Sequence, residues 1–157
     1  MRTDSITKFY DEYKDEVYMY ILSLCSDHYL AQDIMQEVFI KALLSLDCSH
    51  ENVKAWLFRV AKNLWIDNIR KNKNISTLNI EDKTQEILSS IIKSEEQLNL
   101  YSKVMNLNNA MREVITLYYY LEIDQSSIAD IMGISNGAVR TMLYRARKVL
   151  KSMMEDV

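Results

Sequence analysis

Proline is absent from the 157 residues, and glycine occurs only at Gly133 and Gly137. Tight turns between β-strands depend on these two residue types, so their scarcity argues against a β-rich fold. Cysteine is also scarce, and two residues, Cys25 and Cys48, are too few for a disulfide framework. We therefore expect an all-α chain in a reducing environment.

Long apolar runs are missing as well. No stretch approaches the roughly 18 consecutive apolar residues that a membrane-spanning helix needs. Residues 1–20 carry charges throughout, which is unlike a secretory signal peptide. With 48% hydrophobic and 26% charged residues, the composition is typical of a globular protein. We expect a cytoplasmic location without membrane insertion of this chain.

Positive charge is in the minority and unevenly placed. The formal net charge is −3, from 19 Lys and Arg against 22 Asp and Glu. Residues 51–75 hold six basic and two acidic residues, residues 135–157 hold five and two, and residues 1–50 hold four and nine. Two basic islands in an acidic chain suggest two phosphate-contacting surfaces with little nonspecific attraction to DNA. Solvated helix faces without a ligand are the alternative.

Helical periodicity predicts three helices in the first half of the chain. Apolar residues recur at three- and four-residue spacing over 6–24, 28–46 and 53–71. In the first of these helices we expect one inward stripe: Ile6, Phe9, Tyr13, Val17, Ile21 and Leu24. In the second we expect four inward residues: Leu30, Ile34, Val38 and Leu43.

The second half carries the spacing of a helix-turn-helix. Asp124 can cap a helix over 125–132, and Gly133 can adopt the left-handed conformation that ends it. Ser135 can cap the next helix, whose inward face would be Val139, Leu143, Ala146, Leu150 and Met153. In this motif the second helix enters the major groove, which leaves a mixed polar and basic face for DNA: Asn136, Arg140, Thr141, Tyr144, Arg145 and Lys148. An ordinary helical hairpin with a basic surface is the alternative.

Three stretches together resemble the extracytoplasmic-function (ECF) sigma factors of bacterial RNA polymerase. "AQDIMQEVFIKALLSL" resembles the polymerase-binding helix of that family, and "AWLFRVAKNLWIDNIRK" resembles its promoter-melting helix. The stretch from Leu107 to Lys151 resembles its helix-turn-helix domain. The resemblance implies two small helical domains, sigma domain 2 over 1–74 and sigma domain 4 over 97–157, joined by a flexible linker over 75–96.

The resemblance also implies a role for particular residues. Those matching the polymerase-binding helix are Asp33, Gln36, Glu37, Phe39 and Lys41. Those matching the element that opens the minus-10 region and captures a flipped base are Trp56, Arg59, Lys62, Asn63, Asp67 and Arg70, with the loop from Asp47 to Lys54 helping to form the pocket. At the minus-35 duplex, Asn136, Arg140, Thr141, Tyr144 and Arg145 would lie on the base-reading face, and Arg147, Lys148 and Lys151 would mainly contact phosphate.

The implied partners are core RNA polymerase, promoter DNA and an anti-sigma factor, and no cofactor or metal is expected. The chain departs from the family pattern at Asn108, where Pro is common, at Ser127, where Glu is usual, and at Met142, where a basic residue is common. These departures leave the promoter sequence open.

Other functions remain open from the residues alone. A dimeric helix-turn-helix regulator would fit the last third of the chain but leaves the first half unexplained. A helical protein-interaction module without DNA function is a second alternative. A zinc site would need Cys25, His28, Cys48 and His50, whose spacing is weak evidence. No catalytic motif is recognisable, so we do not expect an enzyme.

Overall fold

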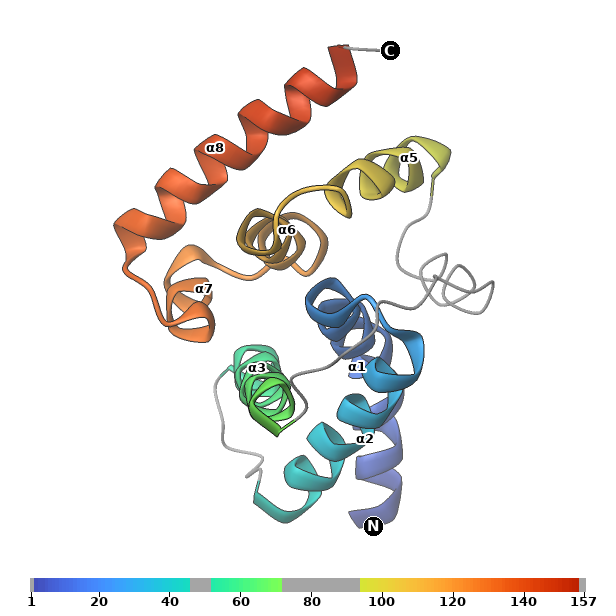
Figure 1. Cartoon of the computed structure of the whole chain (residues 1–157). Coiled ribbons are helices and arrows are strands. Elements are labelled where there is room, and N and C mark those ends of the chain that lie inside the picture. The colour runs from blue at the N-terminus through green and yellow to red at the C-terminus, as the bar shows by residue number, and fades with distance from the viewer. Residues whose placement is uncertain (1, 46–51, 72–93, 156–157) are drawn as a thin grey trace.

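The computed structural model describes residues 2–45, 52–71 and 94–155, and Figure 1 shows their helices. In chain order these are α1 (Arg2–Cys25), α2 (His28–Ser45), α3 (Val53–Lys71), α5 (Glu95–Val104), α6 (Asn109–Ile115), the π-helical turn η1 (Thr116–Tyr120), α7 (Gln125–Met132) and α8 (Asn136–Glu155). The described residues contain no strand, which confirms the all-α prediction. None of the described helices is long and apolar enough to cross a membrane. The expected linker lies mostly outside these residues.

Local capping explains where α2 and α3 begin. The Asp27 carboxylate accepts hydrogen bonds from the backbone N–H groups of Tyr29 and Leu30, at 3.0 and 3.3 Å, in the first turn of α2. The Asn52 side-chain oxygen accepts one from the backbone of Ala55, at 3.2 Å, in the first turn of α3. Both caps satisfy donors that have no partner within the helix.

One residue expected to face inward on α2 is exposed. Leu43 is 56% exposed, and Ala42 is buried in its place. Ala42 comes four residues after the buried Val38 and continues the same stripe, whereas Leu43 is turned by about 100° from it. The prediction for Leu43 is therefore wrong.

The second half of α1 is buried on all sides rather than along one stripe. Every residue from Val17 to Ser23 is buried, and Tyr18, Tyr20 and Leu22 are at most 1% exposed. A helix that is apolar all round needs partners on more than one side. α1 contacts α2 and α3 on one side and α6 on another.

The helix-turn-helix forms as predicted. An Asp124 carboxylate oxygen accepts from the backbone of Ser127 at 3.1 Å, and Gly133 ends α7 with φ +69°. The Ser135 hydroxyl accepts from the backbone of Ala138 at 3.1 Å in the first turn of α8. The expected inward face of α8 is buried, with only Met153 partly exposed.

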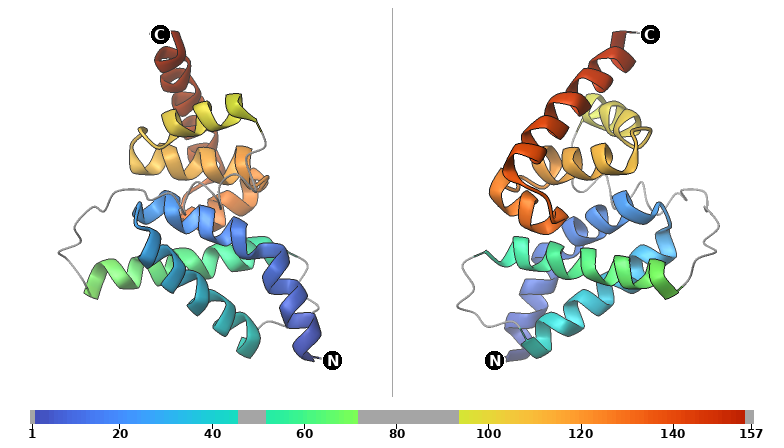
Figure 2. Two further views of the ribbon diagram at one scale, coloured as in Figure 1. Left: turned by 90° about the vertical axis from the view of Figure 1, so that its right-hand side faces the viewer. Right: turned by 60° about the vertical axis from the view of Figure 1, so that its left-hand side comes forward.

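The described helices form two layers that pack against each other (Figure 2). The N-terminal unit is α1–α3, and the C-terminal unit is α5–α8 with η1. α6 lies on α1, and α7 lies on α3. This packing brings the helix-turn-helix against the helix expected to open the promoter.

Candidate polymerase and promoter surfaces

The polar residues expected to bind polymerase lie on the outer face of α2. Asp33, Gln36, Glu37 and Lys41 are all exposed. Phe39 differs, because its ring packs edge-on against Tyr10 with centroids 4.9 Å apart and is partly buried.

Sequence reasoning missed an apolar extension of this surface. Ile40, Leu43 and Leu44 are exposed by 56%, 56% and 78% near the end of α2. Exposed aliphatic residues gathered at one helix end are typical of an interaction surface. Their signal in the sequence was the extra leucine in "ALLSL", which a single apolar stripe cannot accommodate.

Four of the residues expected to bind the minus-10 element share one face of α3. Arg59, Asn63, Asp67 and Arg70 are exposed and follow one another at steps of four, four and three residues, so they form a continuous outer row. Trp56 is partly buried and packs against the core. The row offers two guanidinium groups for phosphate and one amide for base contact.

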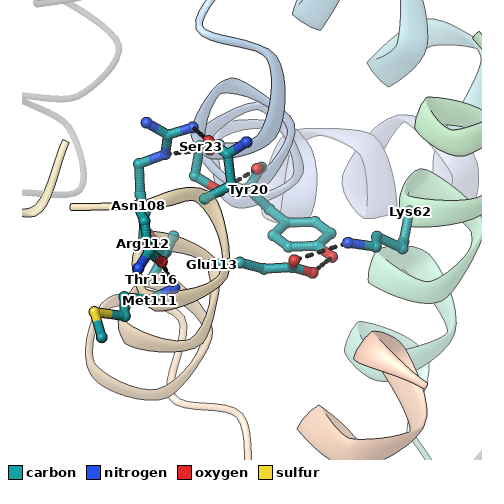
Figure 3. A network of polar contacts seen from close by, with 9 residues as sticks. Tyr20, Ser23, Lys62, Asn108, Met111, Arg112, Glu113 and Thr116 are labelled. Atoms are coloured by element: carbon teal, nitrogen blue, oxygen red, sulfur yellow. Dashed lines mark hydrogen bonds and ion pairs between the residues drawn. The ribbon is translucent and has the colours of Figure 1, made fainter. Parts of the chain in front are cut away.

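Lys62 lies on a different face of α3 and enters the contact between the two units. Its ammonium is 2.7 Å from Oε1 of Glu113 on α6, and the side chains are 19% and 5% exposed (Figure 3). The Tyr20 hydroxyl donates a 2.7 Å hydrogen bond to Oε2 of the same carboxylate. Burial, followed by the negative charge of Glu113, raises the pKa of Tyr20 well above its ordinary value, so the hydroxyl stays protonated and remains a donor. No sequence pattern pointed to Glu113.

The start of α3 also contacts the C-terminal unit. The Asn52 amide donates to the Ser127 hydroxyl at 3.1 Å. The Lys54 ammonium donates to the Leu121 carbonyl at 2.7 Å and pairs with Glu16 at 2.6 Å. Residues 47–51 of the loop implied to help form the minus-10 pocket lie outside the described residues.

Arg112 makes a second buried polar contact between the units. It is 8% exposed, and its Nε donates to the Ser23 carbonyl at 2.6 Å. Its terminal nitrogens donate to the Asn109 side chain at 2.9 Å and to the Met105 carbonyl at 3.2 Å. Burial lowers the pKa of this guanidinium, but hydrogen bonds to three acceptors satisfy the charge.

All the residues expected on the minus-35 surface are exposed on α8: Asn136, Arg140, Thr141, Tyr144, Arg145, Arg147, Lys148 and Lys151. Arg147 is engaged with η1, since its Nε donates to the Tyr119 hydroxyl and its guanidinium lies 5.8 Å from the Tyr118 ring centroid. The structure therefore turns Arg147 toward η1, and Lys151, one turn further along α8, lines the same pocket as Arg147.

The two departures from the family pattern at helix starts have local explanations. Asn108 caps α6, where its side-chain oxygen accepts from the backbone of Met111 at 2.9 Å. The Ser127 hydroxyl donates to the Asp124 carboxylate at 2.7 Å, which completes a short capping arrangement at the start of α7. Asn108 and Ser127 therefore both take part in hydrogen bonds that cap the starts of α6 and α7.

The residues weighed as zinc ligands have other partners where they are described. The Cys25 thiol donates to the Asp27 carbonyl at 3.4 Å, and a ring nitrogen of His28 is 2.7 Å from the Tyr18 hydroxyl. Cys48 and His50 lie outside the described residues. The described part of the chain holds no group of three or more candidate metal ligands.

Comparison with known proteins accounts for both units. The family model "Sigma-70 region 2" matches residues 9–75, and "Sigma-70, region 4" matches residues 97–150. The chain is 34% identical to the ECF RNA polymerase sigma factor SigM of Bacillus subtilis, over 95% of this chain and 94% of that protein. This chain is an ECF sigma factor. The family consists of transcription initiation factors that act with RNA polymerase inside the cell and are not enzymes.

Further relatives agree with this assignment. The ECF sigma factor SigW of Bacillus subtilis is 31% identical over 98% of this chain and 91% of that protein. Among solved structures, the sigma factor RpoE in complex with the anti-sigma factor NepR from Bartonella quintana shares the fold with a TM-score of 0.74, at 22% identity, over 96% of this chain and 97% of that one. CnrH in complex with the cytosolic domain of CnrY gives a TM-score of 0.66, at 21% identity, over 98% of this chain and 90% of that one. Because the region 2 match explains the first half of the chain, the dimeric regulator is not favoured.

Proposed function

We propose that this sigma factor directs core RNA polymerase to its promoters through three separate surfaces. The outer face of α2 docks on polymerase, the outer row of α3 binds the minus-10 element, and the outer face of α8 reads the minus-35 element. Residues 1–74 then act as domain 2 and residues 97–157 as domain 4, with residues 75–96 joining them.

The observation that carries this proposal is the separation of the two basic faces. The outer row of α3 belongs to the N-terminal unit and the basic face of α8 to the C-terminal unit. Each face is small, and the chain as a whole is acidic, so neither is expected to hold DNA tightly alone. Bound to one polymerase, both faces gain effective concentration for the same promoter.

An anti-sigma factor is the partner that the relatives suggest. RpoE and CnrH were each solved in a complex, the first with the anti-sigma factor NepR and the second with the cytosolic domain of CnrY. We propose that this chain is likewise held by an anti-sigma factor and that it acts in the cytoplasm, where core polymerase transcribes DNA.

Reconstituted transcription tests the proposal directly. Purified chain and bacterial core polymerase are incubated with a genomic fragment library, and the new start sites are mapped. We expect start sites that share two spaced upstream elements. If a folded chain and an active, cognate core polymerase give no new start sites, the proposed function is wrong.

A further inference from the structure

Three residues on the minus-10 side of the N-terminal unit make polar contacts with the C-terminal unit. The Lys62 ammonium is 2.7 Å from the Glu113 carboxylate, and the Lys54 ammonium is 2.7 Å from the Leu121 carbonyl. The Asn52 amide is 3.1 Å from the Ser127 hydroxyl. The contact between the units therefore engages the inner side of α3, while the outer row on α3 stays exposed.

Glu113 is the most deeply buried charge in this contact. Its side chain is 5% exposed, and each carboxylate oxygen has a partner, Oε1 at Lys62 and Oε2 at the Tyr20 hydroxyl (Figure 3). Both partners belong to the N-terminal unit and lie 51 and 93 residues away in sequence. A buried carboxylate is tolerated only when its oxygens are satisfied, so the position of Glu113 depends on the units being together.

Arg112, which precedes Glu113 on α6, carries the opposite charge, and its buried position also depends on contact with the N-terminal unit. Nε of Arg112 donates to the carbonyl of Ser23 in the last turn of α1. Carbonyls in the last turn of a helix have no partner within the helix, and the negative end of the helix dipole favours a cation there. Adjacent residues of opposite charge thus fix α6 to α1, which gives the contact a defined register.

Apolar packing accompanies these polar contacts. Residues 17–23 of α1 are buried all round because α6 covers the side that α2 and α3 leave open. This apolar area favours association of the units but does not by itself decide which polar groups meet. The hydrogen bonds and the ion pair of Arg112 and Glu113 set how the two units are aligned.

We propose that Glu113 is an intramolecular latch that keeps the free sigma factor closed and withholds Lys62 from promoter DNA. In the closed state the carboxylate takes the place of a DNA phosphate as the anionic acceptor for the Lys62 ammonium. Opening exchanges one anion for the other, so promoter DNA, which can contact Lys62 only in the open state, binds that state better and shifts the population toward it. The role of Lys62 on DNA rests on the proposed function, whereas the latch itself is a property of the free chain.

The test compares three full-length variants with the wild type in the absence of polymerase. Glu113→Gln keeps the shape of the side chain but removes its charge, and Tyr20→Phe removes only the hydroxyl that donates to it. Glu96→Gln is the matched control, because Glu96 is exposed on α5. Small-angle X-ray scattering measures whether the chain is closed. Amine acetylation followed by mass spectrometry measures the accessibility of Lys62, with the exposed Lys151 as an internal reference.

We expect wild-type Lys62 to be acetylated about tenfold more slowly than Lys151. Glu113→Gln should bring Lys62 close to the rate of Lys151 and enlarge the radius of gyration. Tyr20→Phe should also raise the acetylation rate of Lys62 and the radius of gyration, but by less than Glu113→Gln does. Glu96→Gln should match the wild type in both measurements.

The latch is overturned if Glu113→Gln remains as compact as the wild type, even when Lys62 reacts faster, because the lost ion pair alone would explain that rate. It is also overturned if wild-type Lys62 reacts as fast as Lys151. If circular dichroism shows that Glu113→Gln is unfolded, the Tyr20→Phe variant decides by the same two readouts. Neither measurement requires transcription, so the two proposals can fail separately. If the chain is inactive with core polymerase but the variants behave as expected, the proposed function is wrong and the latch is supported.

Discussion

The guanidinium of Arg112 on α6 donates to the carbonyl of Ser23, 89 residues away, near the end of α1. A side chain with 8% exposure thereby satisfies a helix end that would otherwise be buried without a partner. The contact joins a unit that matches Sigma-70 region 2 to one that matches region 4.

Arg112→Ala should destabilise the protein by about 3 kcal/mol. The substitution leaves the Ser23 and Met105 carbonyls without their charged donor in a buried contact. Urea denaturation followed by circular dichroism measures the change. Arg145→Ala, at an exposed position on α8, should stay within about 0.5 kcal/mol of the wild type. Equal stability of the two variants would show that the buried contact contributes nothing.

Glu37→Lys should weaken binding to core polymerase about tenfold or more while the fold is kept. Glu37 lies exposed on the outer face of α2, so the charge reversal changes the docking surface rather than the core. Fluorescence titration with core polymerase measures the affinity. Glu96→Lys makes the same charge change on α5 and should leave the affinity unchanged. Unchanged binding by a folded Glu37→Lys variant would remove α2 from the docking surface.

Arg145→Ala should lower transcription from promoters with an intact minus-35 element by about tenfold. Arg145 is exposed on the face of α8 expected in the major groove, and a base contact from arginine is worth about 1–3 kcal/mol. Lys151→Ala is the control, because loss of a phosphate contact should reduce activity on intact and mutated elements alike. If Arg145→Ala retains the wild-type preference for the intact element, Arg145 does not read it.

The Cys25 thiol should react slowly in the folded protein. Burial raises its pKa from 9.0 to about 11, so at pH 8 the reactive thiolate is about a hundredfold scarcer than in the unfolded chain. The reaction rate should keep rising with pH until about 11. The Cys48→Ser variant isolates Cys25, and thiol-disulfide exchange with a chromogenic reagent, with and without urea, measures the rate. Equal rates with and without urea would contradict the burial of this thiol.

Much of the local structure was predictable because the signals are short in range. The expected helix over 53–71 matches α3 in both bounds, and the cap at Asp124 and the left-handed Gly133 mark α7 as expected. A cap or a helix end is decided by residues within one turn, so the sequence holds the information. The exposed rows on α3 and α8 follow from the same helical period.

Two features of the structure that the sequence does not reveal come from contacts between residues far apart in the chain. Periodicity predicts a single inward stripe on α1, because no neighbouring residue indicates that α6 will cover the opposite side. The unbroken apolar run "VYMYIL" over residues 17–22 is the one signal in the sequence. The family resemblance places Lys62 at the minus-10 element, and nothing near it in the sequence indicates that its ammonium pairs with Glu113 in the free chain.

The helices, their caps, the helix-turn-helix and the two basic islands can be predicted from the chain alone, because periodicity, capping and charge are properties of neighbouring residues. How the basic islands are engaged in the free chain depends on tertiary packing. The pairing of Glu113 with Lys62 and Tyr20 depends on two helical units packing in one register, and the free energy of burying a charge depends on partners that the local sequence does not specify.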